Sequence, residues 1–209
     1  MNPRYDSAAA LLHLRDADPR LGELIDDCGP FSLQLHRSGD LFASLLQAII
    51  YQQLHGRTAA KIHGRVLALI DSVPQPSTVD ALDDNALRTA GLSRAKLSAL
   101  RDLSAHAQQG KVPSLVQARR MSDEALVKNL SSVKGIGPWS VQMLLLFRLG
   151  RPDVMPAGDF AIRLAFSRHF LAGSPVTQNQ LLDHAARWRP WRSVAAWYLW
   201  RSLAPDGGQ

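Results

Sequence analysis

The sequence predicts an all-α protein, and three observations support that prediction. Apolar residues recur at spacings of three and four along most of the chain, as at Leu41, Leu45 and Ile49, which is the period of one helix face. Serine, threonine or aspartate precedes most of these runs, where such side chains cap helices. Alternation of apolar and polar residues, which indicates a strand, is confined to the short segment 31–36. We therefore expect about ten helices joined by short turns.

In the first half of the chain, most expected helices begin at a capping residue. Asp40 precedes the first long apolar stripe, and Asp83 and Ser93 stand before two further runs. Gly110 is placed to end the last of these helices, and the proline-containing segment 73–77 is interpreted as a linker. The helices expected in this half cover 8–14, 19–25, 41–53, 58–70, 84–90 and 94–110.

The second half carries equally clear start and stop signals. Ser122 can cap a helix, and Thr177 with Gln180 has the spacing of a capping box. Pro138 suits the first position of a helix, where its missing N–H costs nothing, and Gly150 is placed to end that helix. The helices expected here cover 123–130, 138–149, 160–170, 178–187 and 191–203.

Composition limits the chemistry that the chain can perform. Its 209 residues can form one sizeable core or two small lobes. The net charge of +6 suits an anionic partner such as DNA, although a soluble basic protein need not bind one. Cys28 is the only cysteine, which excludes an internal disulfide and any four-cysteine zinc or iron–sulfur site. Without a secretory segment or an apolar run near ~18 residues, we expect a cytosolic protein with no membrane contact.

The stretch 130–159 organises the chain. Gly135, Ile136 and Gly137 lie between two helical segments, and the second segment is apolar almost all round over 141–149, so we expect it to be buried. Glycines allow a sharp turn or a close approach of the backbone, and N–H groups at a helix start favour an anion. Lys134 adds a positive charge. The pattern indicates a phosphate-binding hairpin, while an ordinary helix corner in the core would look the same.

Asp159 follows the turn Pro156-Ala157-Gly158 and precedes a helical run. An aspartate in this position is often only a helix cap. The order of glycine hairpin, buried helix, proline–glycine turn and aspartate, however, resembles the helix-hairpin-helix (HhH-GPD) DNA glycosylases over about residues 41–200. Within that superfamily the chain is most similar to the DNA-3-methyladenine glycosylase II family.

This resemblance implies an enzyme of base excision repair. It would hydrolyse the N-glycosidic bond of alkylated purines such as 3-methyladenine and 7-methylguanine in double-stranded DNA, and leave an abasic site. Asp159 would be the catalytic carboxylate, because the transition state is oxocarbenium-like and a fixed carboxylate stabilises it. Trp139 stands where strand-cutting relatives carry a lysine that forms a Schiff base, which predicts a monofunctional enzyme.

The resemblance also assigns the remaining site residues. An alkylated base is electron-deficient and stacks well on aromatic faces, although aromatic stripes are more often core. Base extrusion requires a wedge that fills the gap in the stack. The predicted base pocket is Trp139, Trp200 and Phe160, and the predicted DNA contacts are Gln53, Leu54 and His55 in one turn with Lys134, Gly135 and Gly137 in the hairpin.

The expected fold is a single domain over 1–209 with two helical lobes around a cleft that Asp159 faces. A middle lobe covers about 38–135, and a second combines 1–37 with 136–209. We expect a monomer in the bacterial cytosol or nucleoid, with no required cofactor and no iron–sulfur cluster. By resemblance, the backbone carbonyls of Ser131, Val133 and Gly135 are candidate ligands for Na⁺ or K⁺.

Two alternatives remain at this point. One is a glycosylase of another lesion specificity, although adenine or thymine-mismatch enzymes usually carry the cluster cysteines that this chain lacks. The other is a non-catalytic helix-hairpin-helix module that only binds DNA. Such a module needs the glycine hairpin but neither the aspartate nor an aromatic pocket, so the presence of both favours an enzyme.

Overall fold

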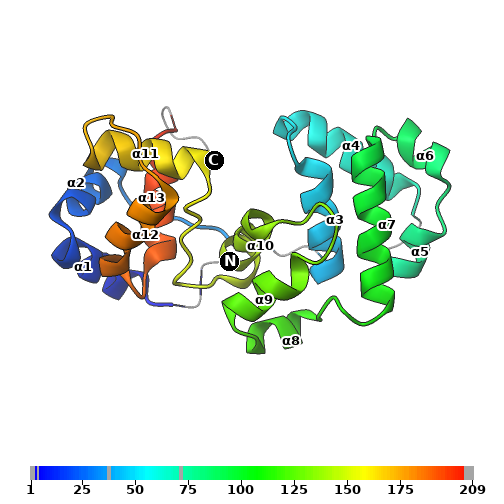
Figure 1. Cartoon of the computed structure of the whole chain (residues 1–209), viewed down its shortest axis with the longest axis horizontal. Coiled ribbons are helices and arrows are strands. Elements are labelled where there is room, and N and C mark those ends of the chain that lie inside the picture. Colours follow the sequence, from blue (N-terminus) through cyan, green and yellow to red (C-terminus); the bar gives the residue numbers. More distant parts are fainter. Residues whose placement is uncertain (1–2, 4, 37–38, 71–72, 205–209) are drawn as a thin grey trace. The chain divides into compact units, whose positions relative to one another are not determined.

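The computed structural model describes residues 3, 5–36, 39–70 and 73–204 (Figure 1). These residues form thirteen α-helices, one π-helical turn and one 3-10 turn, and none of them lies in a strand, which confirms the all-α prediction. The chain folds as two compact units, the first of Met1–His36 with Gln142–Gln209 and the second of Arg37–Val141. No helix in the described part is long and apolar enough to cross a membrane.

The first unit is built around its last helix. Its elements are α1 (Ser7–Ala17), α2 (Pro19–Cys28), η1 (Leu145–Leu149), α11 (Phe160–Phe170), α12 (Gln178–Ala185), η2 (Ala186–Trp188) and α13 (Arg192–Arg201). Most of α13 is buried, and it packs against α1, α2 and α11. The hydroxyl of the buried Tyr198 donates to the carbonyl oxygen of Gly29 at 3.0 Å, and burial raises the pKa of Tyr198 to about 12.

A buried carboxylate joins four elements of this unit. Asp18 is 4% exposed and stands between α1 and α2, where it caps α2 by accepting from the backbone N–H of Leu21. Its Oδ2 also accepts from Trp188 Nε1 at 3.0 Å and lies 2.7 Å from His184 Nε2. Because a buried carboxylate is costly unless it is hydrogen-bonded, this arrangement is the reason that Asp18 is tolerated in the core.

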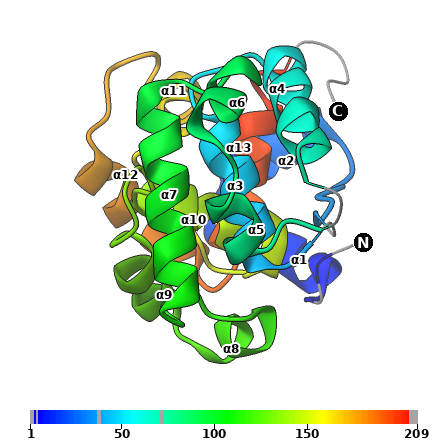
Figure 2. The same ribbon diagram turned by 90° about the vertical axis from the view of Figure 1, so that its right-hand side faces the viewer.

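The second unit is organised by its longest helix. Its elements are α3 (Leu41–Tyr51), α4 (Gly56–Ala68), α5 (Pro76–Asp80), α6 (Asp84–Thr89), α7 (Arg94–Gln108), α8 (Leu115–Arg120), α9 (Asp123–Leu130) and the start of α10 (Pro138–Leu144). The 15-residue α7 packs against α3, α5 and α6 (Figure 2). The apolar face of α3 is buried, so α3 and α7 together form the core of the unit.

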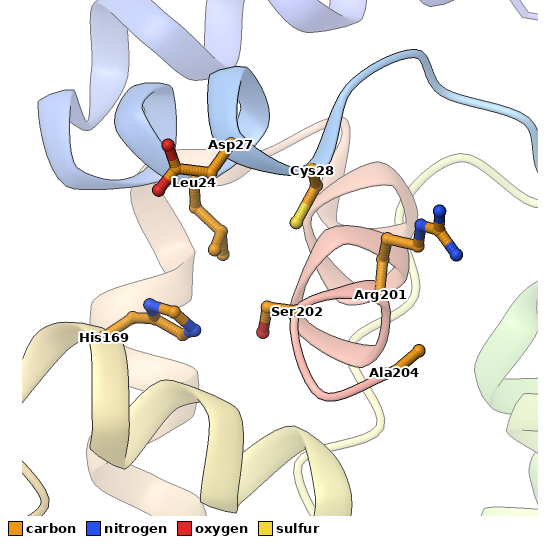
Figure 3. A pocket seen from close by; sticks show the side chains of 7 residues that line it. All are labelled: Leu24, Asp27, Cys28, His169, Arg201, Ser202 and Ala204. Atoms are coloured by element: carbon orange, nitrogen blue, oxygen red, sulfur yellow. The ribbon is translucent and has the colours of Figure 1, made fainter. Parts of the chain in front are cut away.

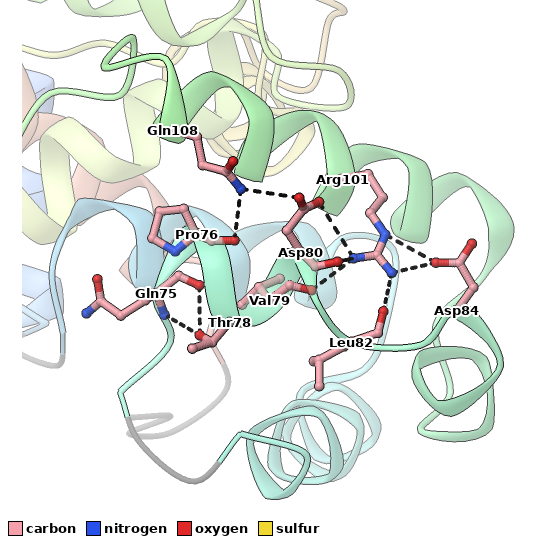
Figure 4. A network of polar contacts seen from close by, with 9 residues as sticks. All are labelled: Gln75, Pro76, Thr78, Val79, Asp80, Leu82, Asp84, Arg101 and Gln108. Carbon is pink, nitrogen blue, oxygen red and sulfur yellow. Dashed lines mark hydrogen bonds and ion pairs between the residues drawn. The ribbon is translucent and has the colours of Figure 1, made fainter.

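Arg101 on α7 holds the two short helices α5 and α6 (Figure 4). Its guanidinium donates to the carbonyl oxygens of Val79, Asp80 and Leu82, and to the Asp84 carboxylate at 2.6 Å. A five-residue helix leaves its last carbonyls without intrahelical partners. One arginine supplies those partners, so Arg101 has a structural role and belongs to no ligand site.

Most helix starts agree with the sequence prediction. Five predicted caps each accept the backbone N–H of the residue three positions on, namely Asp40, Asp83, Ser93, Ser122 and Thr177. The linker prediction for 73–77 was wrong at its end, because α5 already begins at Pro76. The helix α8 was not predicted, although Ser114 and Gln117 form a capping box in front of it. The alternating segment 31–36 forms no strand.

Candidate active site

The Asp159 carboxylate is held by hydrogen-bond donors from two helices of the first unit. Asp159 is the N-cap of α11, and its Oδ1 accepts from the backbone N–H of Ile162 at 2.9 Å. The same oxygen accepts from Trp200 Nε1 on α13 at 3.1 Å. The turn before it is closed by the Asp159 N–H, which donates to the carbonyl of Pro156 at 2.8 Å. Asp159 is half-buried, so its carboxylate is oriented by the fold without being sealed in the core.

Trp200 connects this carboxylate to a second aromatic ring of the same unit. The Trp200 ring lies 5.7 Å from that of Phe147, centroid to centroid, at an interplanar angle of 33°. The structure therefore brings Trp200, which the sequence predicted, to Asp159, and it places Phe147, which the sequence did not predict, against Trp200. Phe160 follows Asp159 in the chain, and its side chain is 74% exposed.

Phe147 was missed because its helix changes register. The predicted helix over 138–149 is α-helical only to Leu144 and continues as the π-helical turn η1, and π-turns are frequent at functional sites. The segment 31–36 fixes this turn, since the His36 N–H donates to the Phe147 carbonyl at 2.8 Å and Arg148 Nη1 donates to the His36 carbonyl at 2.6 Å. Gly150 ends the turn at a φ of 65°, as predicted for the helix stop.

The glycine hairpin lies in the second unit, and its two glycines differ. Gly135 has a φ of 77°, and an added Cβ there would lie 3.0 Å from the Cβ of Ala99 on α7. Gly137 has no positive φ, and an added Cβ would meet nothing within 4 Å. The fold itself therefore requires the first glycine, whereas the second leaves open space in front of the backbone.

Lys134 holds the hairpin to α7 through both its backbone and its side chain. The Lys134 N–H donates to Asp102 Oδ2 at 2.7 Å, and its ammonium group donates to Ser98 Oγ at 2.8 Å. An ammonium group carries three N–H donors, so this contact leaves donors of Lys134 for a phosphate. Lys96, near the start of α7, donates to the Ile50 carbonyl at 2.7 Å, and burial lowers the pKa of its ammonium group.

The predicted wedge lies in the turn between α3 and α4. Gln53 has a φ of 55°, uncommon for a non-glycine residue, and the Leu54 side chain is 36% exposed. His55 is exposed and is the N-cap of α4 without a side-chain capping bond. Gln52, the C-cap of α3, donates from Nε2 to the carbonyl of Gly135 at 2.8 Å. The turn and the hairpin are thus joined within one unit.

Trp139 lies in the first turn of α10 and is 45% exposed. It belongs to the second unit, whereas Asp159 belongs to the first. Its predicted place in the base pocket, and the predicted cleft that Asp159 faces, stay predictions.

The predicted cation site involves carbonyls that already accept hydrogen bonds. The Val133 carbonyl accepts from the Ile136 N–H at 3.0 Å, and the Gly135 carbonyl accepts from Gln52. A Na⁺ or K⁺ ion would need the second lone pair of each oxygen, together with the Ser131 carbonyl. Among the described residues, no three His, Cys, Asp or Glu side chains gather as metal ligands. The monovalent cation stays a prediction.

A cavity of about 320 Å³ lies in the first unit at the far end of α11 from Asp159 (Figure 3). Its lining residues are Leu24, Asp27, Cys28, His169, Arg201, Ser202 and Ala204. Burial raises the pKa of the Cys28 thiol and lowers the pKa of His169, so both groups are held toward their neutral forms. A protonated thiol is a poor nucleophile, and none of the predicted site residues lines this cavity.

A helix–glycine hairpin–helix followed by an aspartate at the start of the next helix is the arrangement expected of the helix-hairpin-helix (HhH-GPD) class. Residues 46–190 match the family model described as the HhH-GPD superfamily base excision DNA repair protein. This chain belongs to that family.

One protein sequence and two solved structures illustrate what this chain is similar to. DNA-3-methyladenine glycosylase 1 of Schizosaccharomyces pombe is 36% identical over 164 residues, which are 77% of this chain and 72% of the relative. A solved structure of the S. pombe 3-methyladenine DNA glycosylase in complex with abasic DNA matches with a TM-score of 0.79 at 32% identity and covers 96% of this chain and 100% of that one. DNA-3-methyladenine glycosidase of Bacillus halodurans matches with a TM-score of 0.84 at 29% identity, over 92% of this chain and 88% of the other.

Proposed function

We propose that this chain is a monofunctional DNA glycosylase that excises alkylated purines, such as 3-methyladenine and 7-methylguanine, from double-stranded DNA. It leaves an abasic site for base excision repair. Relatives that carry the name 3-methyladenine DNA glycosylase, one of them solved on abasic DNA, support this activity. The observation that carries the proposal is the Asp159 carboxylate, oriented by Ile162 and Trp200 beside aromatic rings.

The proposed reaction is hydrolysis at C1′ of the deoxyribose. The bond between C1′ and the purine nitrogen breaks with its electron pair on the base, and a water oxygen forms the new bond to C1′. A purine alkylated at N3 or N7 carries a positive charge, so it leaves as a neutral molecule. The Asp159 carboxylate stabilises the cationic sugar and accepts the proton of the attacking water. One carboxylate suffices because the leaving group needs no acid.

The base pocket that we propose uses the exposed side chains of Phe160 and Trp139 and the half-buried ring of Trp200. A cationic base is attracted to the electron-rich faces of Trp200 and Phe160, and Trp139 is the third proposed wall. Trp139 also supports the monofunctional assignment, because an indole nitrogen cannot form the Schiff base that a lysine forms in strand-cutting relatives.

The proposed DNA contacts are Lys134 and Gly137 in the hairpin, with Gln53, Leu54 and His55 in the wedge turn. The enzyme must extrude its target nucleotide, and an exposed leucine at a turn can fill the gap that this leaves in the stack. We place this activity in a monomer in the bacterial cytosol or nucleoid, without a required cofactor.

Release of free base from methylated duplex DNA tests the proposed function. We expect the wild-type protein to release 3-methyladenine and 7-methylguanine, and the product strand to stay intact until alkali is added. Strand nicking before alkali would show that another amine attacks C1′ and would refute the monofunctional assignment. Tight binding to abasic DNA without release of any alkylated base would make the protein a binding module.

Replacing Trp200 with phenylalanine tests the hydrogen bond to the catalytic carboxylate. Trp200→Phe keeps an aromatic face but removes the Nε1 donor to Asp159. We expect single-turnover base release to fall by about 10- to 100-fold, the loss that a hydrogen bond to a charged group implies. Trp197→Phe is the matched control, because that ring packs against Phe31 in the core and should leave release unchanged. Equal rates in the two variants would contradict the role of the indole N–H.

A further inference from the structure

The wedge turn is short and carries backbone strain. The Leu54 N–H donates to the Tyr51 carbonyl at 3.3 Å, and Gln53 adopts a left-handed φ of 55° without being glycine. Such a conformation persists only where neighbouring structure holds it. The side chains of Gln53 and Leu54 are exposed, so they contribute little to holding it.

The side chain of Gln52, the first residue of the turn, connects the turn to neighbouring structure. Its Nε2 donates to the Gly135 carbonyl at 2.8 Å and reaches Ser140 Oγ at 3.5 Å. Gly135 has a left-handed φ of 77°, and a Cβ added there would come within 3.0 Å of the Ala99 Cβ, so the hairpin backbone lies close against α7 at this point. The amide therefore connects the wedge turn to a closely packed point of the hairpin, across 83 positions of sequence.

Helix α7 contacts both the hairpin and the end of α3, from which the wedge turn starts. It holds the hairpin through Asp102 and Ser98, and it holds the end of α3 through Lys96, whose ammonium group donates to the Ile50 carbonyl. All of these contacts lie within the unit Arg37–Val141. The turn, the hairpin and α7 thus form one polar framework, and the Gln52 amide is its link between the two proposed DNA-contacting loops.

We propose that Gln52 is a positioning residue that sets the Gln53–Leu54 wedge relative to the phosphate-binding hairpin. This inference rests on the proposed function. When the hairpin holds a DNA phosphate, the Gln52 amide keeps Leu54 at the depth and angle that insertion into the stack requires. Loss of the amide leaves DNA anchored at the hairpin, while the wedge samples conformations that do not insert.

The test uses Gln52→Met, which keeps the length of the side chain and removes its donor. Gln108→Met is the matched control: Gln108 also lies in the second unit and donates to Asp80 at 3.3 Å and to the Pro76 carbonyl at 3.5 Å, away from both loops (Figure 4). The probes are a duplex with a tetrahydrofuran abasic site opposite 2-aminopurine, read by fluorescence at saturating protein, and a methylated duplex for single-turnover base release.

We expect Gln52→Met to bind the abasic duplex within about twofold of wild type, while the fluorescence change per bound complex and the release rate both fall by about tenfold, near the upper limit for one neutral hydrogen bond. Gln108→Met should match wild type in all three readouts. Gln52→Leu, which also lacks the donor and adds no charge beside the proposed phosphate site, should behave as Gln52→Met does and provides a second variant if the first fails to fold.

The outcomes separate this inference from the proposed function. Normal fluorescence and release in Gln52→Met overturn the positioning role, as does a loss of affinity as large as the loss of release, which would make Gln52 a direct DNA contact. Wild-type protein that binds without any fluorescence change also overturns it. If the wild type releases no base but its fluorescence change depends on Gln52, the proposed function fails and the positioning role is supported.

Discussion

Asp159→Asn should abolish most base release while leaving the fold and DNA binding intact. The asparagine keeps an Oδ1 that can accept from the Ile162 N–H and from Trp200 Nε1, and it caps a helix as well as aspartate does. What disappears is the negative charge beside the developing sugar cation and the base for the attacking water. We expect single-turnover release to fall by about 10²- to 10⁴-fold.

The matched control is another aspartate that caps a helix of the same unit. Asp6 precedes α1 and accepts from the N–H groups of Ala8 and Ala9 at 2.9 and 3.1 Å. Asp6→Asn should release base at the wild-type rate, because its carboxylate only caps. Release by Asp159→Asn within a few-fold of wild type would mean that Asp159, too, is only a cap, and would remove the basis of the proposed chemistry.

Local sequence signals predicted the fold well because caps and apolar periodicity act over three or four residues. Asp159 shows how far such signals extend: the same carboxylate is a helix cap and the candidate catalytic group, and both interpretations follow from its position before α11. Its second donor, Trp200, lies 41 positions away, and no local pattern indicates that an indole N–H will reach that oxygen.

The features that the sequence did not predict depend on packing. Phe147 lies in an apolar run that any helical interpretation would bury, but it stands in the π-turn η1 with its ring 5.7 Å from that of Trp200. The contact between Gln52 and Gly135 joins two loops that the sequence treats separately. The ammonium group of Lys96 donates to the Ile50 carbonyl at the end of α3, a contact between residues 46 positions apart.

The two hairpin glycines look equivalent in the sequence, and their substitution should separate folding from DNA binding. Gly135→Ala should destabilise the protein, because its φ of 77° disfavours any L side chain and the new Cβ would approach Ala99 to 3.0 Å. A cost of about 1–2 kcal/mol for the left-handed backbone corresponds to a fall in melting temperature of about 2–8 °C.

Gly137→Ala should leave the stability of the protein unchanged and weaken its binding to DNA. Its Cβ would enter open space at an ordinary φ, so the melting temperature should stay within about 2 °C of wild type. If the Gly137 backbone approaches a DNA phosphate, the new methyl group blocks that approach and removes a charge-assisted hydrogen bond, which weakens binding to abasic duplex by at least about tenfold. Thermal melting and fluorescence-anisotropy titration of both variants measure the two effects. Wild-type affinity in Gly137→Ala would show that no phosphate lies close to this backbone, and the hairpin would then be the structural corner that its sequence also allows.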